Sequence, residues 1–176
     1  KVHQVKKELY RLINTMIDAL ADYYQLQSKS SWDRIEELER REIFLPKAAL
    51  DLKELLTLSQ GLRLSVYFAH GKQKENVANI EKNEAIISAL YKRSLPFYEA
   101  MKQFYLLVQV SQDPTRALQQ ERFFSDSFYT QGVIAYRMMK YLKAEELFAQ
   151  ETARTFDYLE RYGDLKVVLG KCLEAK

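Results

Sequence analysis

Apolar residues in the first part of the chain recur at spacings of three and four positions. One stripe covers residues 2–24, a short one covers 32–38, and a third covers 49–69. Such spacing places apolar side chains on one face of a helix, whereas a half-buried strand alternates with a period of two. Pro46 suits the first turn of the third helix, where its missing N–H costs nothing. The pattern therefore predicts three helices before Gly71, a suitable C-terminal cap.

Small and polar residues mark expected helix ends and packing sites in this part. Ser30 with Asp33 resembles a capping box at the start of the second helix. Gly61 interrupts the third helix at a cost of about 1 kcal/mol relative to Ala, and close contact with another helix is the usual reason for such a residue. Residues 71–77 are polar and predict a link to the next helix.

The rest of the chain repeats the helical spacing. Further helices are expected over 80–91, 97–108, 115–139 (with a split near Ser125 as an alternative), 142–161 and 164–175. Pro96 is expected to stop or kink a helix, and Tyr162-Gly163-Asp164 is expected to break another. Ser111–Pro114 is the clearest break in the pattern. Because no stretch shows sustained strand-like alternation, the predicted fold class is all-α.

Composition agrees with long helices and narrows the functional classes. The 176 residues include only five Gly and three Pro, whereas sheet-rich folds need a turn every ~8–12 residues. The 27 Lys and Arg and 24 Asp and Glu give a net charge of +3. These charges are spread evenly along the chain, which disfavours nucleic acid as a partner. No apolar run approaches the ~18 residues that a membrane span needs.

The single cysteine and the start of the chain bear on where the protein works. Cys172 has no partner for a disulfide within the chain, which favours a reducing, cytoplasmic compartment and leaves a secreted-effector context open. The chain starts at Lys1 rather than Met. We expect it to be part of a longer, bacterial protein.

The most specific spacing lies in residues 125–158. Large, small and aromatic residues stand at set positions on two predicted helices: Phe128, Gly132, Ala135, Tyr141, Ala144 and Phe148. This spacing resembles the tetratricopeptide repeat, a helix–turn–helix unit of about 34 residues. Gly132 and Ala144 would be small where the helices cross, and Phe148 would fill the gap toward the next repeat. The resemblance implies a protein-binding scaffold, and an ordinary helical hairpin is the alternative.

A second resemblance covers residues 6–77. Its similar parts are Leu9-Tyr10-Arg11, Arg34-Ile35-x-x-Leu38, and the helix from Ala49-x-x-Leu52 to Leu62-Arg63-Leu64. They resemble the helical substrate-binding domain associated with uridylyltransferase-like nucleotidyltransferases. The resemblance implies a helical bundle, with the catalytic Gly-Ser turn and Asp-x-Asp pair of such enzymes elsewhere. This chain contains neither motif, so it is not expected to be an enzyme on its own.

Arg63 and His70 offer a catalytic alternative. Their R-x6-H spacing is similar to the motif of HEPN-type ribonucleases, in which Arg stabilises phosphate charge and His acts as acid or base. Seven residues span two helical turns, so both side chains would project from one face. The competing interpretation places Arg63 at the rim of the bundle and His70 at a helix C-terminus.

Together these patterns predict a helical bundle over 1–112 and a tetratricopeptide-like hairpin region over 113–176. The expected function is a non-catalytic module for protein interaction or substrate positioning, with a purely structural spacer as a further alternative. The predicted partner-binding residues are Arg137, Lys140, Lys143 and Arg154, whose charge would suit an acidic protein. No cofactor is expected, and two His and one Cys far apart predict no metal site. The oligomeric state is left open.

Overall fold

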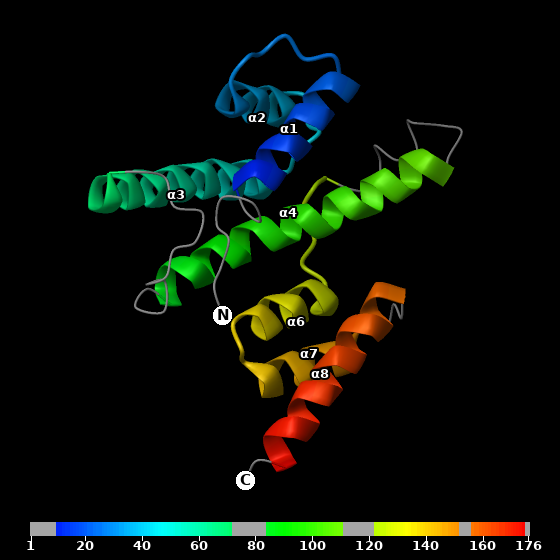
Figure 1. Ribbon diagram of the computed structural model, residues 1–176. Coiled ribbons are helices and arrows are strands. Elements are labelled where there is room, and N and C mark those ends of the chain that lie inside the picture. The colour runs from blue at the N-terminus through cyan, green and yellow to red at the C-terminus, as the bar shows by residue number, and fades with distance from the viewer. Residues whose placement is uncertain (1–9, 72–83, 111–121, 152–155, 175–176) are drawn as a thin grey trace. The chain divides into compact units, whose positions relative to one another are not determined.

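The computed structural model describes residues 10–71, 84–110, 122–151 and 156–174. That part of the chain contains seven α-helices and no strand (Figure 1), which confirms the all-α fold class. The chain divides into two compact units, Lys1–Phe124 and Ser125–Lys176. The predicted boundary between residues 112 and 113 and the break at Ser111–Pro114 lie outside the described residues, as does most of the 71–77 link.

The first unit contains four described helices: α1 (Leu12–Tyr23), α2 (Ser31–Arg40), α3 (Pro46–His70) and α4 (Glu84–Val110). Helix α1 packs against α2 and α4, and α3 packs against α2 and α4. Each helix contributes apolar side chains that are almost fully buried, among them Ile13, Ile17, Leu20, Ile35, Leu38, Leu52, Leu55, Leu90 and Phe97. Burial of each such side chain contributes about 1.5–3 kcal/mol, which makes this shared core the main support of the unit.

A segment that follows the four helices completes the core of the first unit. Phe123 is 1% exposed, and its ring lies 5.2 Å from that of Phe44 and 5.1 Å from that of Phe104. The N–H of Leu45 donates to the carbonyl of Arg122 at 3.1 Å. These contacts tie the end of the unit to the start of α3.

The second unit contains α6 (Phe128–Arg137), α7 (Tyr141–Gln150) and α8 (Phe156–Glu174). Helices α6 and α7 form a hairpin, and α8 packs against both of them. Helix α6 is capped by Ser127, whose side chain accepts a hydrogen bond from the N–H of Thr130 at 3.1 Å. Residues 122–127 are not helical, so the expected helix over 115–139 is interrupted near Ser125, where a split is the alternative expectation, and residues 115–121 lie outside the described residues.

Several expected caps are confirmed. Ser30 accepts a hydrogen bond from the N–H of Asp33 at 3.1 Å, and Pro46 occupies the first turn of α3. Gly71 caps α3 with φ +63°, a left-handed conformation that glycine adopts without steric cost.

The expected stop at Pro96 and the expected break at Gly163 are wrong, whereas the kink at Pro96 stays a prediction. Pro96 lies inside α4 and Gly163 lies inside α8, and both helices continue past them. In α4 the cost of an internal proline, about 3 kcal/mol, is offset by burial on both sides of it, at Leu90 and Phe97. The expected close contact at Gly61 is also absent. A Cβ on Gly61, Gly163 or Gly170 would meet no atom within 4 Å in the described structure.

Three helices end in the same hydrogen-bonded turn, with a residue other than glycine in the left-handed conformation. These residues are Gln25, Glu42 and Met139, with φ of +53°, +58° and +57°. After α6, Met139 N–H donates to Tyr136 O at 3.0 Å and Lys140 N–H donates to Ala135 O at 2.9 Å. This pair of bonds is the Schellman motif, whose left-handed position usually holds glycine.

Candidate functional site

The two helices of the α6–α7 hairpin meet at Gly132. A Cβ at this position would overlap Cδ1 and Cε1 of Phe148 and lie 3.2 Å from its Cγ. The Phe148 ring is 1% exposed and also contacts Tyr129 of α6 and Tyr162 of α8, with ring centroids 5.9 and 6.1 Å apart. Phe148 therefore fills the space that glycine leaves on α6 and reaches the next helix.

The other residues of the repeat-like spacing lie at different depths. Ala135 and Ala144 are buried, at 7% and 0% exposure, whereas Phe128 is 43% exposed. Tyr141 is half-buried and packs edge-to-face on Tyr136, with ring centroids 5.7 Å apart, across the turn that joins α6 to α7. Whether the hairpin belongs to a tetratricopeptide array stays a prediction.

Polar contacts hold the second unit together beyond this core. The carboxylate of Glu151 accepts a hydrogen bond from the N–H of Tyr129 at 2.8 Å, which joins the end of α7 to the start of α6. Lys166 of α8 forms an ion pair with Glu145 of α7. The contact with Glu145 raises the pKa of the Lys166 ammonium above its usual value, and a hydrogen bond with Tyr162 adds a smaller effect in the same direction. Both groups are partly exposed, so the pair contributes little to stability.

Apolar and basic side chains alternate at the turn between α6 and α7. Met139 and Leu142 are 53% and 72% exposed, and the side chains of Lys140 and Lys143 are exposed beside them. We call these four residues the hairpin turn surface. Lys143 forms an exposed ion pair with Glu146 at 3.3 Å, a contact worth ~0–1 kcal/mol that a partner could replace.

The predicted partner-binding residues are thus only partly brought together. Lys140 and Lys143 belong to the hairpin turn surface. Arg137 is half-buried, and its Nε has no hydrogen-bond partner in the described structure. Arg154 lies outside the described residues. The sequence prediction named the charges and missed Met139 and Leu142, because the sequence does not distinguish these two exposed residues from the neighbouring Met138 and Tyr141, which are half-buried.

Arg63 of the catalytic alternative lines a cleft of about 460 Å³ in the first unit. The other described lining residues are Tyr10, Gln60, Leu64 and Tyr67. The guanidinium of Arg63 lies over the ring of Tyr10, with Cζ 4.6 Å from the ring centroid. His70 is the last residue of α3, but its side chain lies outside what the structure describes. The proposed pairing of Arg63 with His70 therefore stays a prediction.

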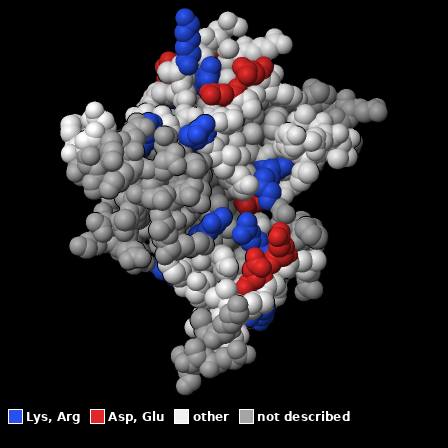
Figure 2. All heavy atoms as spheres, viewed as in Figure 1, with Lys and Arg blue, Asp and Glu red and all other residues white. Residues whose placement is uncertain are grey.

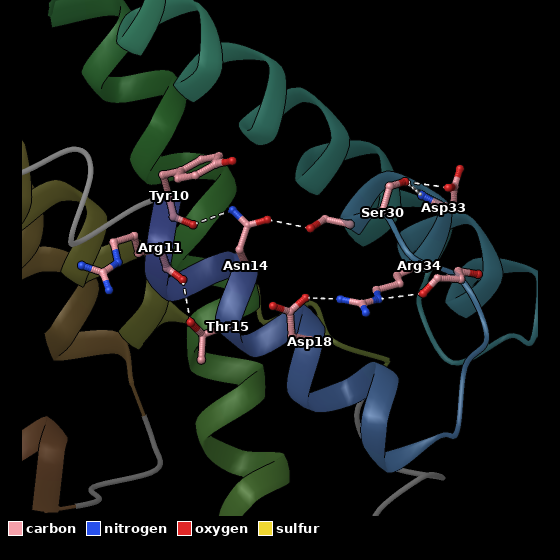
Figure 3. Close-up of polar contacts among 10 residues, drawn as sticks. Tyr10, Arg11, Asn14, Thr15, Asp18, Ser30, Asp33 and Arg34 are labelled. Atoms are coloured by element: carbon pink, nitrogen blue, oxygen red, sulfur yellow. Dashed lines mark hydrogen bonds and ion pairs between the residues drawn. The ribbon is translucent and has the colours of Figure 1, made fainter. Parts of the chain in front are cut away.

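A chain of polar contacts fixes the backbone at Tyr10 (Figure 3). Asn14 donates to the carbonyl of Tyr10 at 2.8 Å and accepts from the hydroxyl of Ser31 at 2.7 Å. Nearby, Arg34 of α2 forms an ion pair with Asp18 of α1. Through Asn14, Ser31 at the start of α2 thereby holds Tyr10, the residue that stacks on Arg63.

The described surface offers no other concentrated chemistry. On the face in view, Lys and Arg lie in separate places with Asp and Glu among them (Figure 2). Among the described residues, no three His, Cys, Asp or Glu side chains gather where they could hold a metal ion. None of the described helices is both long enough and apolar enough to cross a membrane.

Comparison of the chain with protein-family models, with curated proteins and with solved structures returned no match. A functional proposal for this protein therefore depends on its own residues and geometry.

Proposed function

We propose that this chain is a non-catalytic helical module that binds a protein partner through the hairpin turn surface. The observation that carries the proposal is the exposure of Met139 and Leu142 between Lys140 and Lys143. Apolar side chains at the centre of a contact and polar groups around them are the usual composition of a protein interface. The two lysines favour an acidic partner segment.

The hairpin suits this role because its surface is held by a rigid base. The interlock of Gly132 with Phe148 fixes the crossing of α6 and α7, and the two hydrogen bonds of the Schellman motif fix the turn. A partner would therefore meet side chains that are already in place, so little conformational entropy is lost on binding. The resemblance of residues 6–77 to a substrate-binding domain supports a related role, in which the module positions a partner for a catalytic domain of a longer protein.

The test is affinity capture by the whole chain and by two charge-matched variants. One variant carries Lys140→Glu, Lys143→Glu and Leu142→Ser. The control carries Lys29→Glu and Lys92→Glu, which are exposed positions of the first unit, together with Leu50→Ser, an apolar residue of α3 that is 54% exposed. We expect a protein that the wild type and the control retain and the hairpin variant loses.

Two results would contradict the proposal. Equal capture by the hairpin variant and the wild type would remove the hairpin turn surface from consideration. If the wild type captures no protein at all, the purely structural spacer becomes the better account. Circular dichroism of both variants shows whether lost capture reflects the surface or lost helical structure.

A further inference from the structure

The C-terminal part of α3 extends beyond the core of the first unit. The last fully buried side chain of this helix is Ser59, and no described side chain from Gln60 onward is buried. Gln60, Arg63, Leu64 and Tyr67 line the cleft of about 460 Å³. Their spacing of three and four places them along one helix face. The volume lies within the ~300–1,000 Å³ typical of sites for small molecules.

Arg63 brings an uncompensated positive charge into this cleft. In the described part of the chain, its guanidinium donates no hydrogen bond and forms no ion pair, and its Nε is inaccessible to solvent. None of the described lining residues is acidic. A buried donor without a partner is unfavourable and is rare in folded proteins. The terminal N–H groups of the guanidinium are not among the buried atoms, so a bound anion could reach them and compensate the charge.

Tyr10 stacks on a face of the Arg63 guanidinium, so an anion would bind the N–H groups at the edge of that group. Tyr10 covers one face of the planar group at 4.6 Å, and Asn14 holds the backbone of Tyr10 through the contacts drawn in Figure 3. The N–H groups of a guanidinium lie in its plane and match the geometry of a carboxylate or phosphate. The amide of Gln60 adds a further donor on the same helix face.

The rest of the lining is apolar and aromatic. Leu64 and Tyr67 are 57% and 51% exposed. The large apolar side chains of α3 before residue 60 are less exposed than these two, with the exception of Leu50. A flat ring can stack on a tyrosine and cover a leucine, which removes apolar surface from water. The cleft thus combines one anion-binding group with a surface for a flat apolar body.

We propose that this cleft binds a small organic anion, with its phosphate or carboxylate on Arg63 and an aromatic body against Tyr67 and Leu64. The site lies entirely in the first unit, so the proposal does not depend on the hairpin turn surface.

The experiment measures binding of phenyl phosphate to the whole chain by ligand-observed and protein-observed NMR titration. Inorganic phosphate and phenol serve as the two halves of the probe. We expect phenyl phosphate to bind more tightly than either half. Arg63→Gln should weaken phenyl phosphate at least about tenfold, the loss expected for one charge-assisted contact. Tyr67→Ala should weaken phenyl phosphate and leave inorganic phosphate unchanged.

Arg40→Gln is the matched control, because it removes the same charge from an exposed position of α2. It should leave binding unchanged. Arg63→Lys keeps the charge and guards against a folding defect in Arg63→Gln; it should bind more weakly than wild type because it lacks the planar donor pair. The proposal is overturned if no probe binds, if Arg63→Gln binds like wild type, or if Arg40→Gln weakens binding as much as Arg63→Gln.

Discussion

Gly132 and Gly163 lie in helices of the same unit, yet the structure predicts opposite effects when each is replaced by alanine. A Cβ at Gly132 overlaps the Phe148 ring, whereas one at Gly163 meets no described atom within 4 Å. In both helices alanine is favoured over glycine by about 1 kcal/mol of intrinsic propensity. The difference between the two variants therefore isolates the steric term at the α6–α7 crossing.

The steric term should outweigh propensity at Gly132. Carbon atoms pack best at about 3.5–4.0 Å, so the ring of Phe148 would have to move. It is 1% exposed and is flanked by Tyr129 and Tyr162, which leaves little room to do so. Overpacking of a core costs about 1–3 kcal/mol. We expect Gly132→Ala to lower the free energy of unfolding by up to about 2 kcal/mol, which is the overpacking cost less the gain in propensity, and Gly163→Ala to raise it by about 1 kcal/mol.

Urea denaturation followed by circular dichroism gives the two free energies, and hydrogen exchange of amides in α6 and α7 assigns the change to the second unit. A second substitution, Phe148→Leu, provides room for the alanine. The double variant should therefore recover part of the loss that Gly132→Ala causes, as a coupling energy in a double-mutant cycle. Equal free energies of unfolding for Gly132→Ala and Gly163→Ala would refute the reasoning, because the close crossing of α6 and α7 would then carry no steric cost.

Further predictions concern helix ends, a half-buried tyrosine and the catalytic alternative. Glu42→Gly and Met139→Gly should each raise the free energy of unfolding by about 1 kcal/mol, because both relieve a left-handed residue; only Met139→Gly should also weaken capture of a partner. Burial, and the neighbouring Tyr23, raise the pKa of Tyr24 to about 12. Because this folded-state pKa lies above the unfolded value near 10, the contribution of Tyr24 to stability should persist up to about pH 10 and be lost between about pH 10 and 12. In urea titrations at several pH values, the free energy of unfolding of Tyr24→Phe should therefore fall less than that of the wild type between about pH 10 and 12. Single-stranded RNA should remain uncut by the wild type and by His70→Ala alike in a gel assay, and cleavage that His70→Ala abolishes would favour the ribonuclease.

Local signals predicted most of the helices because the relevant interactions are local. Apolar spacing needs only neighbouring turns, and the caps at Ser30 and Gly71 need only residues within a turn of them. The expected stop at Pro96 failed because tertiary packing outweighed a local preference. A proline inside a helix is unfavourable, but the apolar residues on both sides of Pro96 bury into one core, and no local pattern reports that gain.

The cleft at Arg63 could not be predicted because its two key residues are distant in sequence. Tyr10 precedes α1 and Arg63 lies in α3, and only the packing of the bundle brings ring and guanidinium together. Phe123 is a similar case, since it follows the four described helices of the first unit in the sequence and still reaches their core. The R-x6-H spacing drew attention to Arg63, but the structure pairs this residue with Tyr10.

Residues that contradict a local rule help to locate function only when a second feature accompanies them. Gln25, Glu42 and Met139 all occupy a position that favours glycine. At Gln25 and Glu42 the left-handed φ is simply how this glycine-poor chain ends helices. Met139 differs because Leu142, 72% exposed, stands beside it. Arg63 likewise combines an unsatisfied donor with an open cleft. Real proteins tend to depart from local rules where function requires it. At Met139 and at Arg63 such a departure coincides with an exposed apolar residue or an open cleft, which is why the two proposals are made there.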